Sequence, residues 1–327
     1  MSGGLNEPFS PIEDVILPEE DDTGSIPVLN VKGRSLPEAW EKSLLALWQG
    51  GREIRTEYDR KDKEGNFIDP PSKDCSMTFT VLRPNSNPRF HRCFPGGPAD
   101  LQEYRMEVVD GIKDHWVDLE DKRKWQYTYH ERLRQYKLPG VAETPSDTSK
   151  SFGLLYAVQE FPPIDQIQKM IEQLAKSPYT RRCQAVTWQP WHDMDSSDPP
   201  CLRNIWCRIL FDDDGEWYLN MNVSFRSRDG YMAAFMNADA FIHLMNYIAL
   251  CVGSIAKRPV HLGRYCDQSD SYHIYGKDHG RFEREFLAGV NNKTFEERTY
   301  VAEFFAPMMK EAVPGILEKI RKHDSNE

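Results

Sequence analysis

Residues 237–253, NADAFIHLMNYIALCVG, are the feature that most constrains how this chain folds. The segment has the length of a helix and is almost wholly apolar. A helix that is hydrophobic on every side is buried rather than lying on a surface. We find no run of 18 apolar residues, so we expect no membrane span. The sequence therefore predicts a buried central helix with other elements packed around it.

Strand signals dominate the residues that precede this helix. Residues 183–188 (CQAVTW) and 202–211 (LRNIWCRILF) have strand character, and a DDDG turn at 212–215 leads into 216–227 (EWYLNMNVSFRS). Two β-rich runs joined by a glycine-containing turn predict a hairpin. A further strand is expected at 75–82, and helices at 37–51, 100–111 and 163–178. The fold class that follows is α+β, with a sheet covered by helices.

The domain organisation follows from composition. Residues 1–26 are acidic and rich in Pro, Gly and Ser, which predicts a flexible tail. Residues 27–327 are expected to form a single domain, ending in a charged helical stretch with proline interruptions. A hydrophobic content of 39% suits a folded globular protein.

Charge and cysteine content exclude several classes of function. The net charge of −10 argues against a general nucleic-acid coat, which needs a broad basic surface, but leaves room for a small anionic ligand. The seven cysteines are odd in number and form no CxxC pair, so we expect neither a disulfide framework nor a metal site. Free thiols and the lack of a signal-peptide pattern favour a reducing cytoplasm. We therefore expect no membrane and no nucleic acid among the partners.

One cysteine stands in a suggestive setting. Cys201 follows two prolines in DPPCLRNIW, and a buried, inert thiol is its ordinary interpretation. Four local features lie within about 100 residues of it, and each has a plain structural explanation, such as a solvated face or a helix N-cap. They are Arg181-Arg182, the FRSRDG segment at 225–230, Asn237 and the pair His273 and Tyr275. Together, a thiol on a stiff turn and several arginines suggest a nucleophile beside an anion site. Cationic neighbours are also expected to lower the pKa of the thiol.

The order of these motifs resembles that of the thymidylate synthase family, over roughly residues 37–290. The paired arginine stands 19 residues before the Pro-Cys nucleophile, and the RS-x-D motif is matched by residues 226–229. Asn237 lies ten residues after Ser227, and His273-Ile274-Tyr275 matches the H-x-Y motif. The resemblance is strongest to the archaeal-like and hydroxymethylase-like branches. It implies a large mixed sheet covered by helices.

The resemblance also implies a reaction and its substrates. A cysteine thiolate adds to carbon 6 of a pyrimidine nucleoside monophosphate, and carbon 5 then accepts a one-carbon unit from 5,10-methylenetetrahydrofolate. Cys201 is expected to be that nucleophile. The family works as a homodimer with shared sites, so the same is expected here, with folate as cosubstrate and no metal.

Substrate-binding roles come from the same resemblance. Arg226 and Ser227 are expected to bind the 5′-phosphate, and Arg181 and Arg182 to reach the phosphate of the partner subunit. Arg60, in EYDRKD, is a further candidate phosphate arginine. The remaining expected contacts are Asn237 with the uracil ring, His273 and Tyr275 with the sugar 3′-hydroxyl, and Asp229 with the pterin.

A general base has to remove the proton from carbon 5 of the pyrimidine, and in the family a glutamate on an early helix organises that step. The segment DLQEYRMEVVDG offers Glu103 and Glu107, of which we prefer Glu103 by its distance from Gly111. Either glutamate alternatively belongs to a solvated helix face. Tyr129, in YTYHER, resembles the family's active-site tyrosine.

Three departures keep the product open. Leu202 follows the cysteine where histidine is usual, Phe225 stands where glutamine is usual, and the charged end KIRKHDSNE replaces a short apolar closing tail. A hydroxymethylase acting on dUMP, dCMP or CMP is therefore an alternative to a dUMP-methylating synthase. A remoter alternative is a non-catalytic nucleotide- or RNA-binding relative. Asn237 favours uracil, although Asp239 could alter the choice of base.

Overall fold

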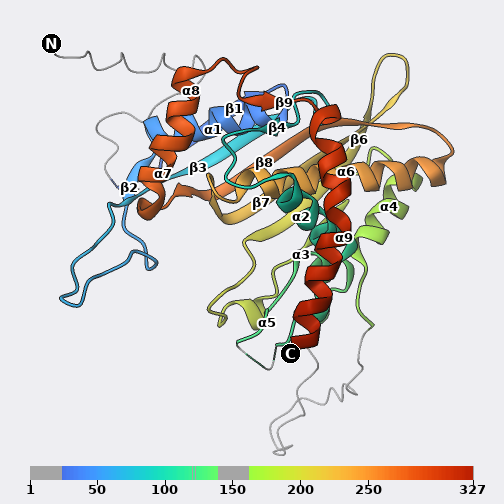
Figure 1. Ribbon diagram of the computed structural model, residues 1–327. Helices are drawn as coiled ribbons and strands as arrows, with labels where there is room; N and C mark the ends of the chain where they lie inside the picture. The colour runs from blue at the N-terminus through green and yellow to red at the C-terminus, as the bar shows by residue number, and fades with distance from the viewer. Residues whose placement is uncertain (1–23, 120, 122, 139–161, 327) are drawn as a thin grey trace, which may run out of the picture.

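The structure is a computed structural model that describes residues 24–119, 121, 123–138 and 162–326 (Figure 1). Most of the predicted N-terminal tail, residues 1–23, lies outside these described residues. The predicted α+β architecture is confirmed: helices pack around a central mixed sheet.

The sheet contains seven strands within the described residues, in the order β1-β3-β8-β7-β6-β5, with β2 paired to β3 outside that path. Two neighbouring pairs, β1–β3 and β7–β8, run parallel, and the others run antiparallel. The strands are β1 (Val28–Gly33), β2 (Arg52–Ile54), β3 (Ser72–Val81), β5 (Gln184–Val186), β6 (Leu202–Phe211), β7 (Trp217–Asp229) and β8 (Val260–Ile274); a separate ribbon pairs β4 (Phe90–His91) with β9 (Thr299–Tyr300).

The predicted hairpin is confirmed as β6–β7, with Trp206 opposite Asn222. Its acidic turn is closed by Asp212, whose Oδ1 accepts the backbone N–H groups of Asp214 and Glu216. Strand β8 was not predicted except at its end, although it lies beside β7 near the middle of the sheet. Its sequence, VHLGRYCDQSDSYHI, carries too many polar residues to show an apolar alternation.

The helices surround this sheet. They are α1 (Leu36–Gly50), α2 (Pro98–Asp110), α3 (Tyr129–Arg134), α4 (Gln166–Lys176), α5 (Pro190–Asp193), α6 (Ala234–Ala256), α7 (His279–Arg281), α8 (Ala288–Asn292) and α9 (Ala302–Asn326). The short 3-10 helices are η1 (Asp114–Trp116) and η2 (Gly276–Asp278), and η3 (Phe282–Leu287) is a π-helix. The predicted central helix is α6, which packs against α1, α2, α4, β7 and β8. By length and composition alone α6 could cross a membrane, but most of its apolar window is buried inside the protein, as in an ordinary core helix.

Two helix ends matter for the site. Helix α2 stops at Gly111, which has a φ of 69° and whose Cβ would lie 2.3 Å from the His130 ring, so only glycine suits this position. Helix α9 runs unbroken through Pro307 and Pro314, so the predicted interruptions are wrong. It packs along α2 (Figure 1), and its charged end contacts η1, where Asp324 accepts the Trp116 Nε1–H.

Candidate functional site

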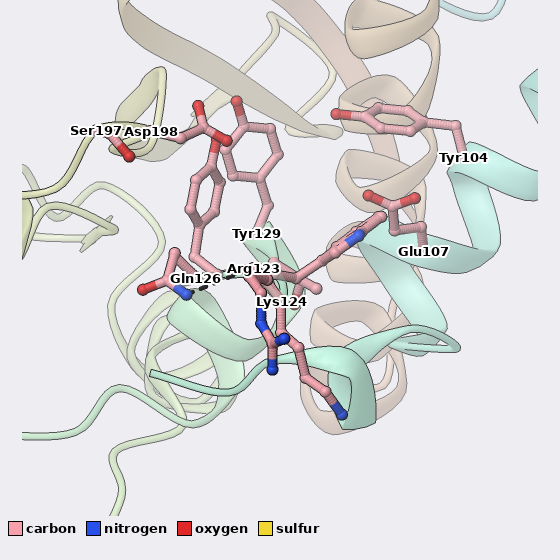
Figure 2. A pocket seen from close by; sticks show the side chains of 11 residues that line it. Tyr104, Glu107, Arg123, Lys124, Gln126, Tyr129, Ser197 and Asp198 are labelled. Atoms are coloured by element: carbon pink, nitrogen blue, oxygen red, sulfur yellow. Dashed lines mark hydrogen bonds between the residues drawn. The ribbon is translucent and has the colours of Figure 1, made fainter. Parts of the chain in front are cut away.

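A cavity of about 350 Å³ opens between α2, the segment leading into α3, and the turn before β6. Figure 2 shows Tyr104 and Glu107 reaching in from α2 on one side, with Ser197 and Asp198 on the opposite side. The lining is rich in tyrosine and in charged groups: Tyr104, Glu107, Arg123, Lys124, Trp125, Gln126, Tyr127, Thr128, Tyr129, Ser197 and Asp198. Such a mixture of aromatic surface and convergent polar groups suits a small polar ligand with a flat ring.

Cys201 lies directly beside this wall. It is half-buried, its backbone hydrogen-bonds the Tyr127 side chain, and the amide of Leu202 donates to the Tyr129 hydroxyl at 3.3 Å. Its turn is held by Arg226, whose Nε and Nη2 donate to the carbonyls of the two preceding prolines at 3.1 and 2.7 Å. The stiff turn and the arginine that the sequence singled out are therefore one structural unit.

The pKa of the Cys201 thiol differs from the expectation. Burial raises it, and the nearby guanidinium groups of Arg226 and Arg228 offset only part of that effect, while the carboxylate of Asp198 adds to it. The prediction of a lowered thiol pKa is wrong for this structure, because the loss of solvation outweighs the cationic neighbours.

Asn237 also reaches the wall of this cavity. Its Nδ2 donates to the Tyr104 hydroxyl at 2.8 Å, and Tyr104 lines the cavity. The residue lies inside the first turn of α6, so it is not a helix N-cap. Asp239, two positions on, forms a two-point ion pair with Arg105 at 2.7 Å and is fully buried. Both carboxylate oxygens of Asp239 are therefore bonded to an arginine of α2.

His273 and Tyr275 form a second group, at the end of β8, where their rings meet edge-on at 4.5 Å. Burial lowers the pKa of His273 to about 4, and its buried Nε2 has no hydrogen-bond partner among the described residues. Burial raises the pKa of Tyr275 to about 12, with contributions from Asp229, Tyr58 and Cys201. Asp229 and Cys201 both interact electrostatically with the Tyr275 hydroxyl, so this group lies near the thiol.

Asp229 and Ser227 occupy the end of β7. Asp229 is bonded to the backbone N–H groups of Tyr231 and Met232, at 3.0 and 2.8 Å, and burial raises its pKa to about 6. Ser227 is half-buried and pairs with Ser271 of β8. Both therefore lie on the strand that carries Arg226.

The two glutamates of α2 have different surroundings. Glu107 lines the cavity, whereas Glu103 is not among the lining residues and pairs with Lys113 and Lys319 at 2.8 Å. The geometry favours Glu107 over the preferred Glu103. An interval of one helical turn cannot be resolved by counting back from Gly111, because both residues share a face of the helix.

The remaining candidate arginines lie elsewhere. Arg60 is exposed and paired with Asp69 at 2.6 Å, on the β2–β3 loop whose Tyr58 approaches Tyr275 at 6.2 Å. Arg181 and Arg182 are exposed just before β5. Since Gln184 pairs with Trp206, Arg182 falls opposite a point seven residues along β6 from Cys201, roughly 23 Å away. The structure does not bring this pair to the thiol of the same chain.

Several contributors were missed by sequence reasoning. Tyr104, Tyr127 and Asp198 contact or surround the thiol, and of these only Asp198, in the same DPPC segment, carried a visible signal. Arg228, inside the RS-x-D motif, is buried and bonded to Asp267 at 2.6 Å. Within the described ranges no group of His, Cys, Asp and Glu has the arrangement of a metal site.

Comparison with known proteins identifies the chain. The family model for thymidylate synthase matches residues 98–292, which include the cavity, the thiol and the motifs of β7 and β8. The chain belongs to the thymidylate synthase family. Its members are one-carbon transferases that use methylenetetrahydrofolate as cosubstrate.

Similar proteins agree with this assignment. A "Putative thymidylate synthase" of Methanopyrus kandleri is 27% identical over 252 residues, covering 76% of this chain and 94% of that protein. A protein of the same description from Methanocaldococcus jannaschii is 27% identical over 256 residues, covering 76% and 91%. The solved thermostable thymidylate synthase A from Bacillus subtilis shares the fold, with a TM-score of 0.51 and 15% identity over 77% of this chain and 83% of that one.

Proposed function

We propose that this enzyme transfers a one-carbon unit from 5,10-methylenetetrahydrofolate to carbon 5 of dUMP, giving dTMP. The observation that carries the proposal is the setting of Cys201, on a turn clamped by Arg226 and next to a tyrosine-lined cavity. An enzyme that adds a nucleophile to an unsaturated ring needs such a thiol, a phosphate anchor close by and a flat, partly polar pocket.

The roles of the binding residues follow from their positions. Arg226 and Ser227 would hold the 5′-phosphate near the thiol, and Asn237 would bond the uracil edge. The buried Nε2 of His273 has no partner in the part of the chain that the structure describes, so it is available to bond a sugar hydroxyl, with Tyr275 beside it. Asp229, at the end of β7, would face the pterin.

The proton steps involve the thiol and the glutamate. The Cys201 thiol must lose its proton before its sulfur adds to carbon 6, and binding of a substrate must overcome its raised pKa. We assign the general base that organises removal of the carbon-5 proton to Glu107 instead of Glu103, because Glu107 lines the cavity. Tyr129 orients the nucleophile segment through its bond to the Leu202 amide.

A homodimer is part of the proposal. Arg181 and Arg182 are exposed, and Arg182 lies opposite a point roughly 23 Å along β6 from Cys201 of its own chain. In a symmetric dimer, each chain would supply these arginines to the phosphate site of its partner. Arg60 would join the same site only if its loop released Asp69.

A pyrimidine nucleotide hydroxymethylase is the second candidate, favoured by helix α9, which packs on α2. If α9 stands where the family resemblance implies an apolar closing tail, water would have easier access to the exocyclic carbon. The outcome would then be a 5-hydroxymethyl nucleotide with release of tetrahydrofolate.

One experiment separates the candidates. The full chain is incubated with 5,10-methylenetetrahydrofolate and, separately, dUMP, dCMP and CMP, and the nucleotide product is weighed by mass spectrometry. The synthase gives dTMP and an equal amount of dihydrofolate from dUMP. The hydroxymethylase gives a product that is one oxygen heavier than the corresponding 5-methyl nucleotide, and no dihydrofolate. No carbon-5 product from any nucleotide would reject both, and Cys201→Ala is the matched inactive control.

A further inference from the structure

A chain of alternating charges links the C-terminal helix to the glutamate of the cavity. Lys319 of α9 places Nζ 2.8 Å from Glu103 Oε2, and Glu103 Oε1 lies 2.8 Å from Lys113 Nζ. The same ammonium group of Lys113 donates to Glu107 Oε2 at 2.8 Å. Glu107 then borders the cavity itself. Four side chains from three segments thus form one continuous polar assembly.

The local structure explains why Lys113 reaches both glutamates. Glu103 and Glu107 are four residues apart on α2, so their carboxylates share a face and repel each other. Gly111 ends the helix in the left-handed conformation and turns the chain back, which lays Lys113 over that face. Lys113 is 9% exposed, so its charge is poorly screened by solvent.

Helix α9 holds the same region through a second contact. Asp324 accepts the Trp116 Nε1–H at 2.8 Å, and the ring of His323 lies 4.2 Å from that of Trp116. Trp116 in turn meets Trp125 edge-on at 5.4 Å, and Trp125 lines the cavity. The end of α9 therefore packs on Trp116, which in turn packs on the cavity residue Trp125.

We propose that Lys113 is a positioning residue that holds Glu107 toward the cavity as a carboxylate, and that Lys319 makes helix α9 part of this assembly. The assembly itself is independent of the reaction, although its importance for catalysis rests on the proposed role of Glu107. No family motif in the sequence contains either lysine.

The charges that face Glu107 act in opposite directions. Burial raises the pKa of Glu107, the ammonium of Lys113 lowers it, and the carboxylates of Glu103 and Asp114 raise it. Asp114 is itself bonded to His130 at 2.6 Å, and Lys319 acts on Glu107 by neutralising Glu103. The other ionisable groups at the cavity are Arg123, Lys124, Asp198, Tyr104, Tyr127 and Tyr129.

The test is a carbon-13 NMR titration of the glutamate side-chain carboxyls in the full chain, with Glu107→Gln to assign the resonance. In Lys113→Met, the titration midpoint of Glu107 should rise by on the order of one pH unit, because its main counter-charge is lost. Lys113→Arg should restore most of the original midpoint. In Glu103→Gln the midpoint should fall, because a repelling carboxylate is gone and Lys113 is left to Glu107 alone.

Helix α9 is tested separately. Lys319→Met should raise the Glu107 midpoint by a smaller amount, since this lysine is 66% exposed and acts through Glu103. Lys322→Met is the matched control, because Lys322 pairs with Glu318 on the same helix and should leave the midpoint unchanged.

The signs of these shifts decide the outcome. The proposal is overturned if the Glu107 midpoint is unchanged in Lys113→Met. It is also overturned if the midpoint rises in Glu103→Gln as it does in Lys113→Met. Should Lys113→Met fail to fold, Glu103→Gln and Lys319→Met decide with their opposite signs. The titration needs no turnover, so it stands even if no one-carbon transfer is found; where turnover exists, the acid limb of the kcat profile should move with the same signs.

Discussion

Strand β6 and the turn before it carry two kinds of cysteine. Cys201 stands just before the strand, half-buried, with Arg226 and Arg228 close enough to offset part of its desolvation. Cys207, six residues on, is wholly buried; burial raises its pKa well above the ordinary value, and Cys183 adds to the shift. Both thiols are in contact with the core, but only the first lies beside a cavity and a cluster of charges.

The difference shows what distinguishes the candidate nucleophile Cys201 from a thiol that only packs in the core. Burial raises the pKa of both thiols, so burial alone does not separate them. Counter-charges, access and a rigid turn do, and all three meet only at Cys201. The exposed Arg181-Arg182 pair lies just before β5, beside the second half of β6, and in the proposed dimer it would serve the phosphate site of the partner chain.

The largest expected effect comes from replacing each of the two cysteines in turn by serine. Cys201→Ser should lower kcat by about 10³-fold or more, because a hydroxyl is a far weaker nucleophile toward an unsaturated ring. Cys207→Ser should keep kcat within a few-fold while lowering the free energy of unfolding by about 1–3 kcal/mol, since it buries a hydroxyl. Steady-state kinetics and urea unfolding measure the two. Equal losses of kcat in the two variants would remove the contrast between Cys201 and Cys207.

The next effect concerns the arginine pair Arg181-Arg182, just before β5. Arg182→Ala should lower kcat/KM by about 10–100-fold, because it removes a charge-assisted bond to phosphate. When this variant is mixed with Cys201→Ser and the subunits are allowed to exchange, about a quarter of wild-type activity should return, since one site of each mixed dimer is intact. Activity is measured against time after mixing, with each variant alone as control. No recovery despite proven exchange would place the arginines outside a shared site.

The smallest effect tests the charges around the thiol. Alkylation of Cys201 by iodoacetamide should be slow near neutral pH and keep rising as the pH passes the ordinary thiol pKa, because the raised pKa delays formation of the thiolate. Asp198→Asn removes a carboxylate that raises this pKa, so alkylation at neutral pH should become a few-fold faster. Peptide mass spectrometry follows Cys201, with Cys207 as the internal unreactive control. A slower reaction in Asp198→Asn would contradict the sign of this interaction.

Local pattern predicted much of the scaffold. Helices α1, α2, α4 and α6 and the β6–β7 hairpin were predicted close to their observed bounds, because each has a clear apolar period and clear turn residues. Strand β8 was missed because it buries polar groups, among them Asp267 bonded to Arg228 and Tyr265. The charged partner of Asp267, Arg228, comes from β7, so the local pattern of β8 does not reveal this network.

The candidate site divides in the same way. Motif spacing singled out Cys201, Arg226, Asn237, His273 and Tyr275, and the structure gathers these residues at neighbouring strand and helix ends. Spacing did not separate Glu103 from Glu107, because both occupy the same helix face, and the structure shows that Glu107 lines the cavity.

The sequence by itself determined the fold class and the family, and it singled out Cys201 as the candidate nucleophile, because these depend on periodicity and on fixed distances between motifs. Only the tertiary structure decided which glutamate lines the cavity, how far the paired arginines lie from the thiol of their own chain, and that Lys113 links Glu107 to Glu103 and helix α9. Burial, charge and distance between remote segments govern these features, and they exist only once the chain has folded.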